Sequence, residues 1–446
     1  MKKRSVAMGL AAIMALAAGA GSVQAADNGE KETVKIAVST YNTDWAQPVI
    51  EAYEKENPNV DVELIEVSGN DMNTKLTMMM QSEKTAPDVI AEDGFMVKAD
   101  AAAGYLEPLD DRLADWDDFK NFEPAILENG RGADGKQYGI PYSTDVQGIW
   151  YNKVLMEEAG MSMPFEPKNW DDIIDAGKKL KEVGGDGFVP IALFNSKSQG
   201  EATSMRTFQN LYYGTNSELY DYDEQKWVID TENYLKVLNF IDTVYNKEDL
   251  GGPIGVVSAN NLSDLMKSDY MLENKVGMFL SADGTIGEYK PAGKYAWPEA
   301  LDVWGFAKIP TVDGSEPGYT TISGGWTWGI PAKASNKDGG FELLKFIANM
   351  ENQRDFCVRY NVLTVRNDVA QEDAYTQQEL SVVNDATAML QYAHFRPAVE
   401  DYASVTSLYT DMVESVSTGT STPEEALETF EAELNRAVGE EAILKK

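Results

Sequence analysis

The sequence has almost none of the two residue types that build metal sites and nucleophile–base pairs. It contains one cysteine, Cys357, and one histidine, His394, in 446 residues. A single cysteine cannot form a disulfide within the chain, and this pair cannot supply the ligands of a structural zinc site or a histidine-dependent triad. We therefore expect no metal and no cofactor. Cys357 is interpreted as a buried helix residue.

Basic residues are also scarce. Lys and Arg total 38 against 73 Asp and Glu, which gives a formal net charge of −35. Removing Lys2, Lys3 and Arg4 with the leader described below leaves about −38. A field of this sign repels phosphate backbones and anionic lipids, so it argues against a nucleic-acid partner. Charge favours a neutral or cationic ligand, although it does not exclude a small anion held by local donors.

Long hydrophobic runs are lacking beyond the first residues. Lys2, Lys3 and Arg4 precede an apolar run from Val6 to Ala20, and Val23-Gln24-Ala25 follows. This pattern is typical of a secretory signal peptide over residues 1–25, and the run is shorter than the roughly 20 residues of a membrane span. No cysteine stands directly after the signal pattern, so we expect no lipid anchor. No later run is long and apolar enough, so we also expect no transmembrane segment. The expected location is the periplasm or the extracellular face.

Two glycine- and acid-rich motifs resemble nucleotide- and calcium-binding loops, but their neighbouring residues exclude both. Gly130 to Lys136 fits GxGxxG and nearly fits a P-loop, but Gln137 stands where a hydroxyl is needed and a strand follows instead of a helix. A hairpin turn at Ala133-Asp134-Gly135 is the better interpretation. Asp221 to Lys226 resembles the start of a calcium loop, but Lys226 occupies the glycine position. No spacing singles out a pair of carboxylates for glycoside hydrolysis.

Strand and helix patterns alternate from Thr33 onward. Apolar alternation predicts strands at Lys35–Ser39, Val60–Val67 and Asp88–Ile90, and helices at Pro48–Asn57 and Asn73–Gln81. Such alternation is typical of α/β domains with parallel strands. About 420 mature residues exceed the usual size of one core, so at least two domains are expected.

The stretch Gln137–Lys153 joins two predicted strands through a short polar segment. Tyr138–Tyr142 and Gly148–Tyr151 are rich in strand-forming residues, and Ser143, Thr144 and Asp145 lie between them. Two hydroxyls and a carboxylate suit a polyhydroxylated ligand. They are equally ordinary turn residues, so the residues alone leave both interpretations open.

A series of motifs resembles a known family. YGIPY is followed by WYNK at Trp150–Lys153, EEAG at Glu157–Gly160 and PKNWDD at Pro167–Asp172, then GMFLSADG at Gly277–Gly284 and FRPAVEDYASV at Phe395–Val405. In this order the chain resembles the sugar-binding extracellular solute-binding proteins of ABC importers, the family that includes maltose-binding protein. The resemblance implies the two-lobed, type II periplasmic-binding-protein fold, with mainly parallel sheets flanked by helices and a ligand cleft between the lobes.

The resemblance also implies lobe boundaries. It places residues 26–144 plus 277–325 in an N-terminal lobe and residues 145–276 plus 326–446 in a C-terminal lobe. The chain would then cross between the lobes near Thr144, Gly277 and Gly325. Such a hinge of several short segments allows closure around a ligand.

Candidate ligand contacts were sought beyond the carboxyl ends of the predicted strands, where ligands of open α/β sheets bind. The stacking candidates are Trp45, Trp326 and Tyr392, although a single tryptophan is more often part of a core. The hydroxyl acceptors are Asp93, Asp145 and Asp283, which could equally be caps or turns. The resemblance and the loop positions complete the predicted site with Tyr41, Asn42, Ser143, Thr144 and Arg396, the last of which could also be structural.

The expected function is that of a non-catalytic, monomeric component that closes on a carbohydrate, an oligosaccharide in the first instance, and delivers it to an ABC transporter permease. Two alternatives stay open. The same fold could bind another small solute, such as a polyamine, a glycerol phosphate or a peptide. A secreted carbohydrate-active enzyme is the third possibility, and an oligosaccharide release assay would separate it from a binding protein.

Overall fold

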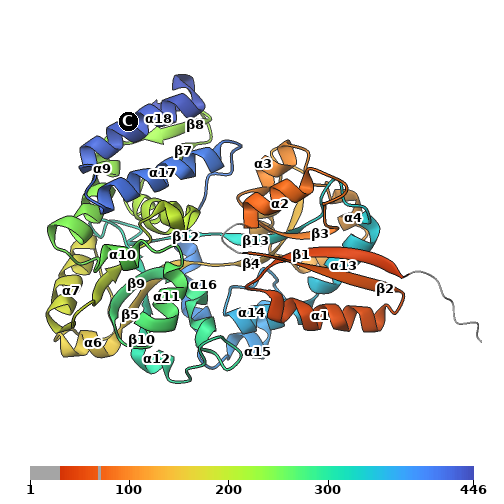
Figure 1. Cartoon of the computed structure of the whole chain (residues 1–446), viewed down its shortest axis with the longest axis horizontal. Coiled ribbons are helices and arrows are strands. Elements are labelled where there is room, and N and C mark those ends of the chain that lie inside the picture. Colours follow the sequence, from red (N-terminus) through yellow and green to blue (C-terminus); the bar gives the residue numbers. More distant parts are fainter. Residues whose placement is uncertain (1–30, 69–71) are drawn as a thin grey trace, which may run out of the picture.

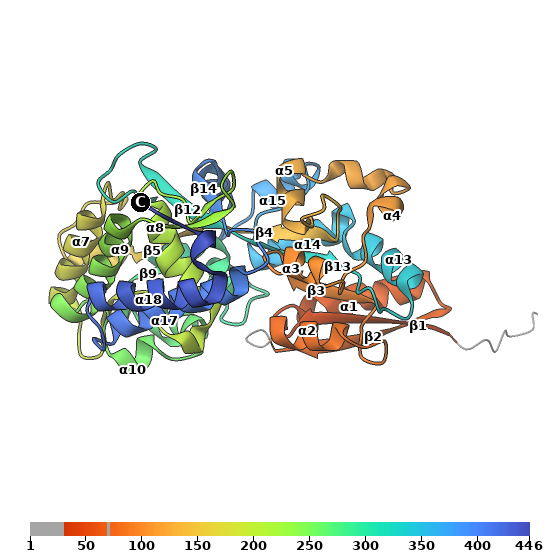
Figure 2. The same cartoon turned by 90° about the horizontal axis from the view of Figure 1, so that it is seen from above.

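The protein consists of two lobes that lie side by side. The computed structural model describes residues 31–68 and 72–446, so the predicted signal peptide over residues 1–25 lies outside the described residues. Extended segments connect the lobes, among them β4 (Gly139–Thr144) and β13 (Gly325–Gly329) (Figures 1 and 2). In residues 31–68 and 72–446, no helix is both long and apolar enough to cross a bilayer.

The N-terminal lobe is built on a five-stranded sheet with the order β2-β1-β3-β13-β4. β1 (Glu32–Ser39) runs parallel to β2 (Val60–Val67) and to β3 (Val89–Asp93), whereas β13 is antiparallel to β3 and β4. The helices of this lobe are α1 (Thr43–Glu56), α2 (Met72–Met80), α3 (Val97–Ala102), α4 (Asp110–Ala114), α5 (Pro124–Leu127), α13 (Lys337–Ile347), α14 (Met350–Tyr360), α15 (Asp373–Thr376) and α16 (Val383–Met389).

The C-terminal lobe has a four-stranded sheet with the order β10-β5-β9-β6. β5 (Gln147–Asn152) is antiparallel to β9 (Val276–Ala282) and β10 (Trp304–Ala307), and β9 is parallel to β6 (Val189–Ala192). Successive residues of a strand point to opposite faces, so Ile149 packs in the core on one face of the sheet and Trp150 in the core on the other. Both faces are therefore buried.

Two small sheets and the remaining helices complete the C-terminal lobe. One sheet contains β11 (Ile309–Pro310), β12 (Tyr319–Ser323) and β14 (Ala393–Phe395), and the other β7 (Tyr220–Asp221), β8 (Lys226–Ile229) and β15 (Ile443–Lys445). The helices are α6 (Lys153–Glu158), α7 (Trp170–Val183), α8 (Asn210–Tyr213), α9 (Thr231–Asp242), α10 (Ile254–Val257), α11 (Leu262–Leu265), α12 (Ala300–Val303), α17 (Tyr402–Ser417) and α18 (Pro423–Val438).

The two-lobed α/β class is as predicted, but two details of the prediction are wrong. The sheets are mixed instead of mainly parallel, because β13 enters the first sheet antiparallel and β5 lies antiparallel between β9 and β10. The lobe boundaries also differ. Residues 277–325 belong to the C-terminal lobe through β9, β10 and β12, and residues 325–389 return to the N-terminal lobe through β13 and α13 to α16.

The chain crosses between the lobes three times, but not at Gly277. That residue lies inside β9, which pairs with β5 and β6 of the same lobe. The crossings fall between β4 and β5, between β12 and β13, and between α16 and β14. Residues 32–144 plus 325–389 therefore form one lobe, and residues 147–323 plus 393–446 form the other.

Candidate ligand-binding site

A cavity of about 360 Å³ lies between the two lobes. The N-terminal lobe contributes Asp93 at the end of β3, Ser143 and Thr144 at the end of β4, and Trp326 in β13. These residues are neighbours in the sheet, since Trp326 pairs with Asp93 on one side and with Ser143 on the other. The C-terminal lobe contributes the segment from Gln199 to Arg206 and the residue Arg396. The cavity therefore has polar walls from both lobes.

An ion pair connects the lobes at this cavity. The Nη2 atom of Arg396 donates to Oδ1 of Asp93 at 2.7 Å, and the two side chains are only 7% and 16% exposed. The Nη1 atom of Arg396 lies 3.5 Å from Oε2 of Glu201. Arg396 thus stands between one carboxylate from each lobe.

Burial dominates the protonation of these carboxyl groups. It raises the pKa of Asp93 even though Arg396 acts in the opposite direction. It raises the pKa of Glu201 to about 7, with Arg396 again opposing. Glu201 consequently exchanges its proton near neutral pH, whereas an exposed glutamate would be ionised there.

An aromatic contact reinforces the ion pair. Phe95 follows β3 in the N-terminal lobe, and its ring packs edge-on against Tyr402 of α17 at 5.4 Å between centroids. The guanidinium carbon of Arg396 lies 4.6 Å from the centroid of the same ring. Asp93 and Phe95 together therefore dock the end of β3 onto the C-terminal lobe.

Ser143, Thr144 and Asp145 line the cavity, but two of them already bond to the hinge. The hydroxyl of Thr144 donates to the Gly324 carbonyl at 2.8 Å, and Oδ1 of Asp145 accepts from the Gly324 amide at 2.9 Å. Ser143 and Thr144 belong to strand β4, so the predicted loop is shorter than expected. These residues join two crossings of the hinge in addition to facing the cavity.

Two of the predicted stacking residues lie elsewhere. Trp45 is 6% exposed and packs in the N-terminal core, 6.2 Å from Trp328 and 5.0 Å from Phe356 between ring centroids. Tyr392 packs edge-on against Tyr319 in the C-terminal lobe at 5.7 Å. Neither of these two rings lines the interlobe cavity, whereas the third predicted platform, Trp326, does.

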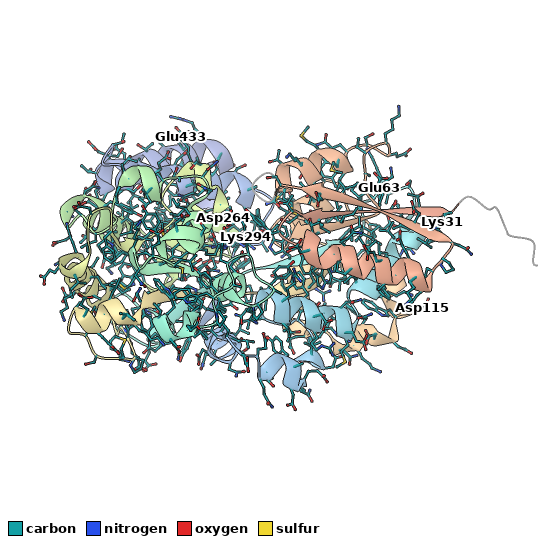
Figure 3. All side chains as sticks on the ribbon, turned by 60° about the horizontal axis from the view of Figure 1, so that its bottom comes forward. Lys31, Glu63, Asp115, Asp264, Lys294 and Glu433 are labelled. Carbon is teal, nitrogen blue, oxygen red and sulfur yellow. The ribbon has the colours of Figure 1, made fainter. Side chains whose placement is uncertain are left out.

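Three other predicted residues do not line the cavity. Asp283 is fully buried behind the hinge, where its Oδ1 accepts from the Val146 amide at 3.1 Å, and burial followed by the charge of Asp145 raises its pKa strongly. Asn42 precedes α1, and its backbone carbonyl accepts hydrogen bonds from amides in the first turn of that helix. Tyr41 is exposed at the rim, near Asp264 and Lys294, which Figure 3 shows at the boundary between the lobes.

The residues of the C-terminal wall of the cavity are not among the predicted ligand contacts. This wall includes Gln199, Glu201, Met205 and Arg206, which follow strand β6. The rule that ligands bind beyond the carboxyl ends of strands applies to β6 as well, so it could have found this segment. Asn73 of α2, Phe95 and Val362 were missed too, and no sequence pattern marks them.

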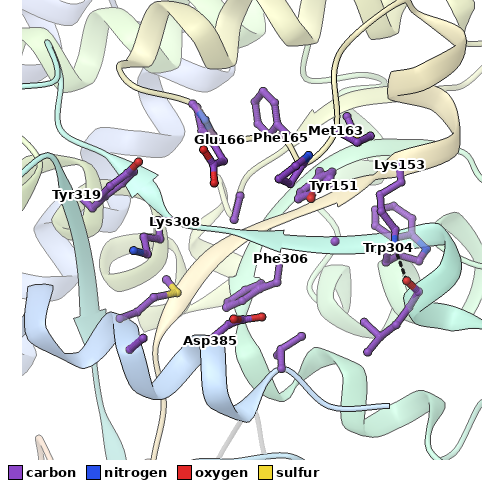
Figure 4. Close-up of a pocket in the computed structure, with 18 of the residues that line it drawn as sticks. Tyr151, Lys153, Met163, Phe165, Glu166, Trp304, Phe306, Lys308, Tyr319 and Asp385 are labelled. Atoms are coloured by element: carbon purple, nitrogen blue, oxygen red, sulfur yellow. Dashed lines mark hydrogen bonds between the residues drawn. The ribbon is translucent and has the colours of Figure 1, made fainter. Parts of the chain in front are cut away.

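A larger cavity of about 720 Å³ shares no lining residue with the cleft. Figure 4 shows Tyr151, Trp304 and Phe306 on its strands and Asp385 on the facing helix α16. Lys308 in this cavity lies over the ring of Tyr319 at 4.9 Å. We assign the ligand site to the smaller cavity, because its lining includes Asp145 and Gly324 of two crossings and the Arg396–Asp93 ion pair that connects the lobes.

Comparison with known proteins identifies the family. A family model described as a bacterial extracellular solute-binding protein matches residues 39–354. A putative binding protein of Brucella abortus (strain 2308) is 26% identical over 97% of this chain and 98% of its own length. The galactooligosaccharide-binding protein of Bacillus subtilis (strain 168) is 22% identical and aligns with 77% of this chain and 75% of its own length.

Solved structures share the two-lobed architecture. The ABC transporter solute-binding protein of Thermotoga lettingae, bound with α-D-tagatose, matches with a TM-score of 0.78 at 22% identity, covering 92% of this chain and all of its own. This likeness shows the fold, and the family model spans more than half of the sequence. The chain therefore belongs to the bacterial extracellular solute-binding proteins.

Proposed function

We propose that the cleft binds an oligosaccharide and that closure of the lobes presents it to the membrane permease of an ABC importer. The observation that carries this proposal is the position of Trp326, which lines the interlobe cavity between Asp93 and Ser143 in the same sheet. Sugar rings have apolar faces and hydroxyl edges, so an aromatic surface beside carboxylates and hydroxyls suits them. The cavity of about 360 Å³ is large enough for a small ligand.

The hinge supports a closing motion. Three short crossings connect the lobes, and residues of two of them, Asp145 and Gly324, line the cavity. A ligand that contacts both walls stabilises the closed state over the open one, and a permease that prefers the closed state then recognises the loaded protein. The galactooligosaccharide-binding protein of B. subtilis and the tagatose-bound protein of T. lettingae also support a sugar ligand.

The proposal is tested with the mature protein in a thermal-shift screen of mono- and oligosaccharides, followed by calorimetry of each stabilising sugar. A ligand that binds the folded state raises the melting temperature by mass action. Trp326→Ala should weaken the affinity by at least about tenfold, because truncating a buried aromatic anchor costs a few kcal/mol. Trp116→Ala is the matched control, since Trp116 is a half-buried tryptophan of the same lobe outside the cavity.

Three results would contradict the proposal in different ways. Equal sugar affinity in the Trp326→Ala variant would place the site elsewhere. Stabilisation only by polyamines, glycerol phosphates or peptides would keep the fold's binding role and change the solute. Turnover of an oligosaccharide by the purified protein would replace binding with catalysis.

A further inference from the structure

The guanidinium group of Arg206 lies in the cleft without a charged partner. Arg206 belongs to the π-helix Thr203–Gln209 and lines the cavity. Its Nη1 atom donates to Oγ of Ser281 at 3.3 Å, and its Cζ atom lies 5.0 Å from the centroid of the Phe194 ring. Its Nε atom is buried and has no hydrogen-bond partner among the described residues. Most donors of this side chain are therefore unused.

Arg206 differs from the other described arginines because it has no carboxylate partner. Within residues 31–68 and 72–446, every other arginine has a carboxylate oxygen within 4.0 Å. The sequence holds 73 acidic residues, so carboxylate partners are plentiful. Burial disfavours the charge of Arg206 and lowers its pKa, with Asp145 and Glu201 partly compensating from a distance. A buried cation of this kind is normally paired.

The carboxylates of the cleft are already bonded. Asp93 accepts from Arg396 at 2.7 Å, and Glu201 accepts from the Tyr402 hydroxyl at 2.7 Å. Asp145 accepts from the Gly324 amide and from the side-chain amide of Gln147, at 2.9 and 3.2 Å. Among the charged residues of this cavity, Arg206 therefore has the most unfilled hydrogen-bonding groups, and these groups are donors.

We propose that the ligand is an acidic oligosaccharide whose carboxylate, as in a uronate unit, binds Arg206. This inference rests on the proposed function and narrows its substrate class. The guanidinium fork matches a carboxylate through two parallel hydrogen bonds, whereas a sugar hydroxyl fills one donor and leaves the charge uncompensated. The negative charge of the whole protein, which favoured a neutral or cationic ligand, is thus a poor guide to this cavity.

The remaining charges of the cleft tolerate an anion. Arg396 compensates Asp93 in a direct ion pair. Burial raises the pKa of Glu201 to about 7, so a large fraction of this group is neutral at neutral pH. Asp145 is the carboxylate that acts on Arg206 most strongly. With Arg396 paired to Asp93, the groups that a uronate in this part of the cleft meets are the Asp145 carboxyl and the unpaired guanidinium of Arg206.

The test uses matched sugar pairs that differ in a carboxylate against a hydroxymethyl group at C6. Oligogalacturonate is compared with α-1,4-linked galactooligosaccharide, and β-1,4-linked oligomannuronate with β-1,4-linked mannooligosaccharide, by calorimetry with the mature protein. We expect the acidic member of one pair to bind at least about tenfold more tightly than its neutral partner, because removing one member of a buried charged pair has a cost of this order or larger.

Variants then assign this preference to Arg206. Arg206→Gln should lower affinity for the acidic sugar by at least about tenfold and by a clearly larger factor than for the neutral sugar. Arg206→Lys, which keeps the charge and loses the fork, should give an intermediate result. Arg354→Gln is the matched control, since Arg354 lies on α14 and pairs with Asp355 outside the cavity. Circular dichroism checks that each variant is folded.

The outcomes separate this inference from the proposed function. If a neutral sugar binds as tightly as its acidic partner and Arg206→Gln binds both unchanged, the acidic ligand is refuted and the sugar-binding function stands. If a sulfated oligosaccharide binds more tightly than any uronate, the carboxylate assignment is wrong. If no sugar of either kind binds, both proposals fail.

Discussion

Replacing Glu201 by glutamine should stabilise the protein in alkaline solution. Glu201 is 20% exposed and lies between Arg396, at 3.5 Å, and the Tyr402 hydroxyl, at 2.7 Å. Burial raises its pKa from 4.5 to about 7 in the folded protein. The glutamine amide oxygen can still accept the Tyr402 hydrogen bond, but it carries no charge that burial disfavours.

The sign and size of the effect follow from proton linkage. Between the unfolded pKa of 4.5 and the folded value of about 7, the folded state holds more of the proton of Glu201. The free energy of unfolding therefore falls as the pH rises through this window, and the loss is complete above it. At 1.36 kcal/mol per pKa unit the loss is about 3 kcal/mol, and this figure already includes the attraction of Arg396, which lowers the folded pKa.

The assay is urea unfolding followed by tryptophan fluorescence, with wild type and Glu201→Gln compared at several values between about pH 5 and pH 8. We expect the smallest difference near pH 5, where little of the loss has occurred, and a more stable variant near pH 8, by up to about 3 kcal/mol. Glu182→Gln, an exposed site on α7, controls for the general effect of the substitution. A variant that is less stable near pH 8, or a difference independent of pH, would refute the reasoning.

Two further predictions concern the core and the hinge. Trp45→Ala should lower the free energy of unfolding by about 3–5 kcal/mol, the usual cost of emptying a buried tryptophan site, and should leave sugar affinity unchanged at temperatures where the variant is folded. Calorimetry would contradict this if affinity fell with stability intact. Gly325→Ala should lower the free energy of unfolding by about 1–3 kcal/mol, because an added Cβ would lie 2.2 Å from the Ser143 carbonyl oxygen. Gly185→Ala, with no heavy atom within 4 Å of the added Cβ, should be neutral in the same experiment.

Elements specified by local signals were predicted well. The strand at Val60–Val67 has the predicted bounds. Local signals also mark the start of α7, where the Asn169 side chain accepts from the Asp172 amide at 2.9 Å, and the start of α18, where Thr422 and Glu425 form a capping box. Caps and alternation depend on neighbouring residues alone, so the sequence carries them directly.

The lobe boundaries could not be predicted in the same way. Placing β9 in the C-terminal lobe depends on its pairing with β5, in which Gly148 lies opposite Ser281. That register connects segments more than a hundred residues apart in the sequence, and nothing near Gly277 indicates it. Apolar strands of either lobe look alike, because both faces of each sheet are covered.

Side-chain orientation explains the errors at the site. Trp45 lies four residues before Val49 and eight before Tyr53, so all three share the buried face of α1. The helical period, which puts Val49 and Tyr53 on the same face as Trp45, could therefore have assigned Trp45 to the core. Its position after the first strand suggested the cleft instead. Where a periodic pattern and a loop-end rule disagree, the period is the stronger guide, because burial of the whole helix face depends on it.

The strand-end rule applied to β6 reaches the segment of Arg206, but no comparable rule shows from the sequence that its guanidinium lacks a charged partner. The total charge of a chain describes its long-range field, but a ligand in a cleft meets the few groups within hydrogen-bonding distance. In this cleft the arrangement of Arg396 between Asp93 and Glu201 satisfies the nearby carboxylates and leaves the second guanidinium unpaired. The sign of the ligand charge therefore depends on which acidic and basic residues are already paired, and only the folded structure determines that pairing.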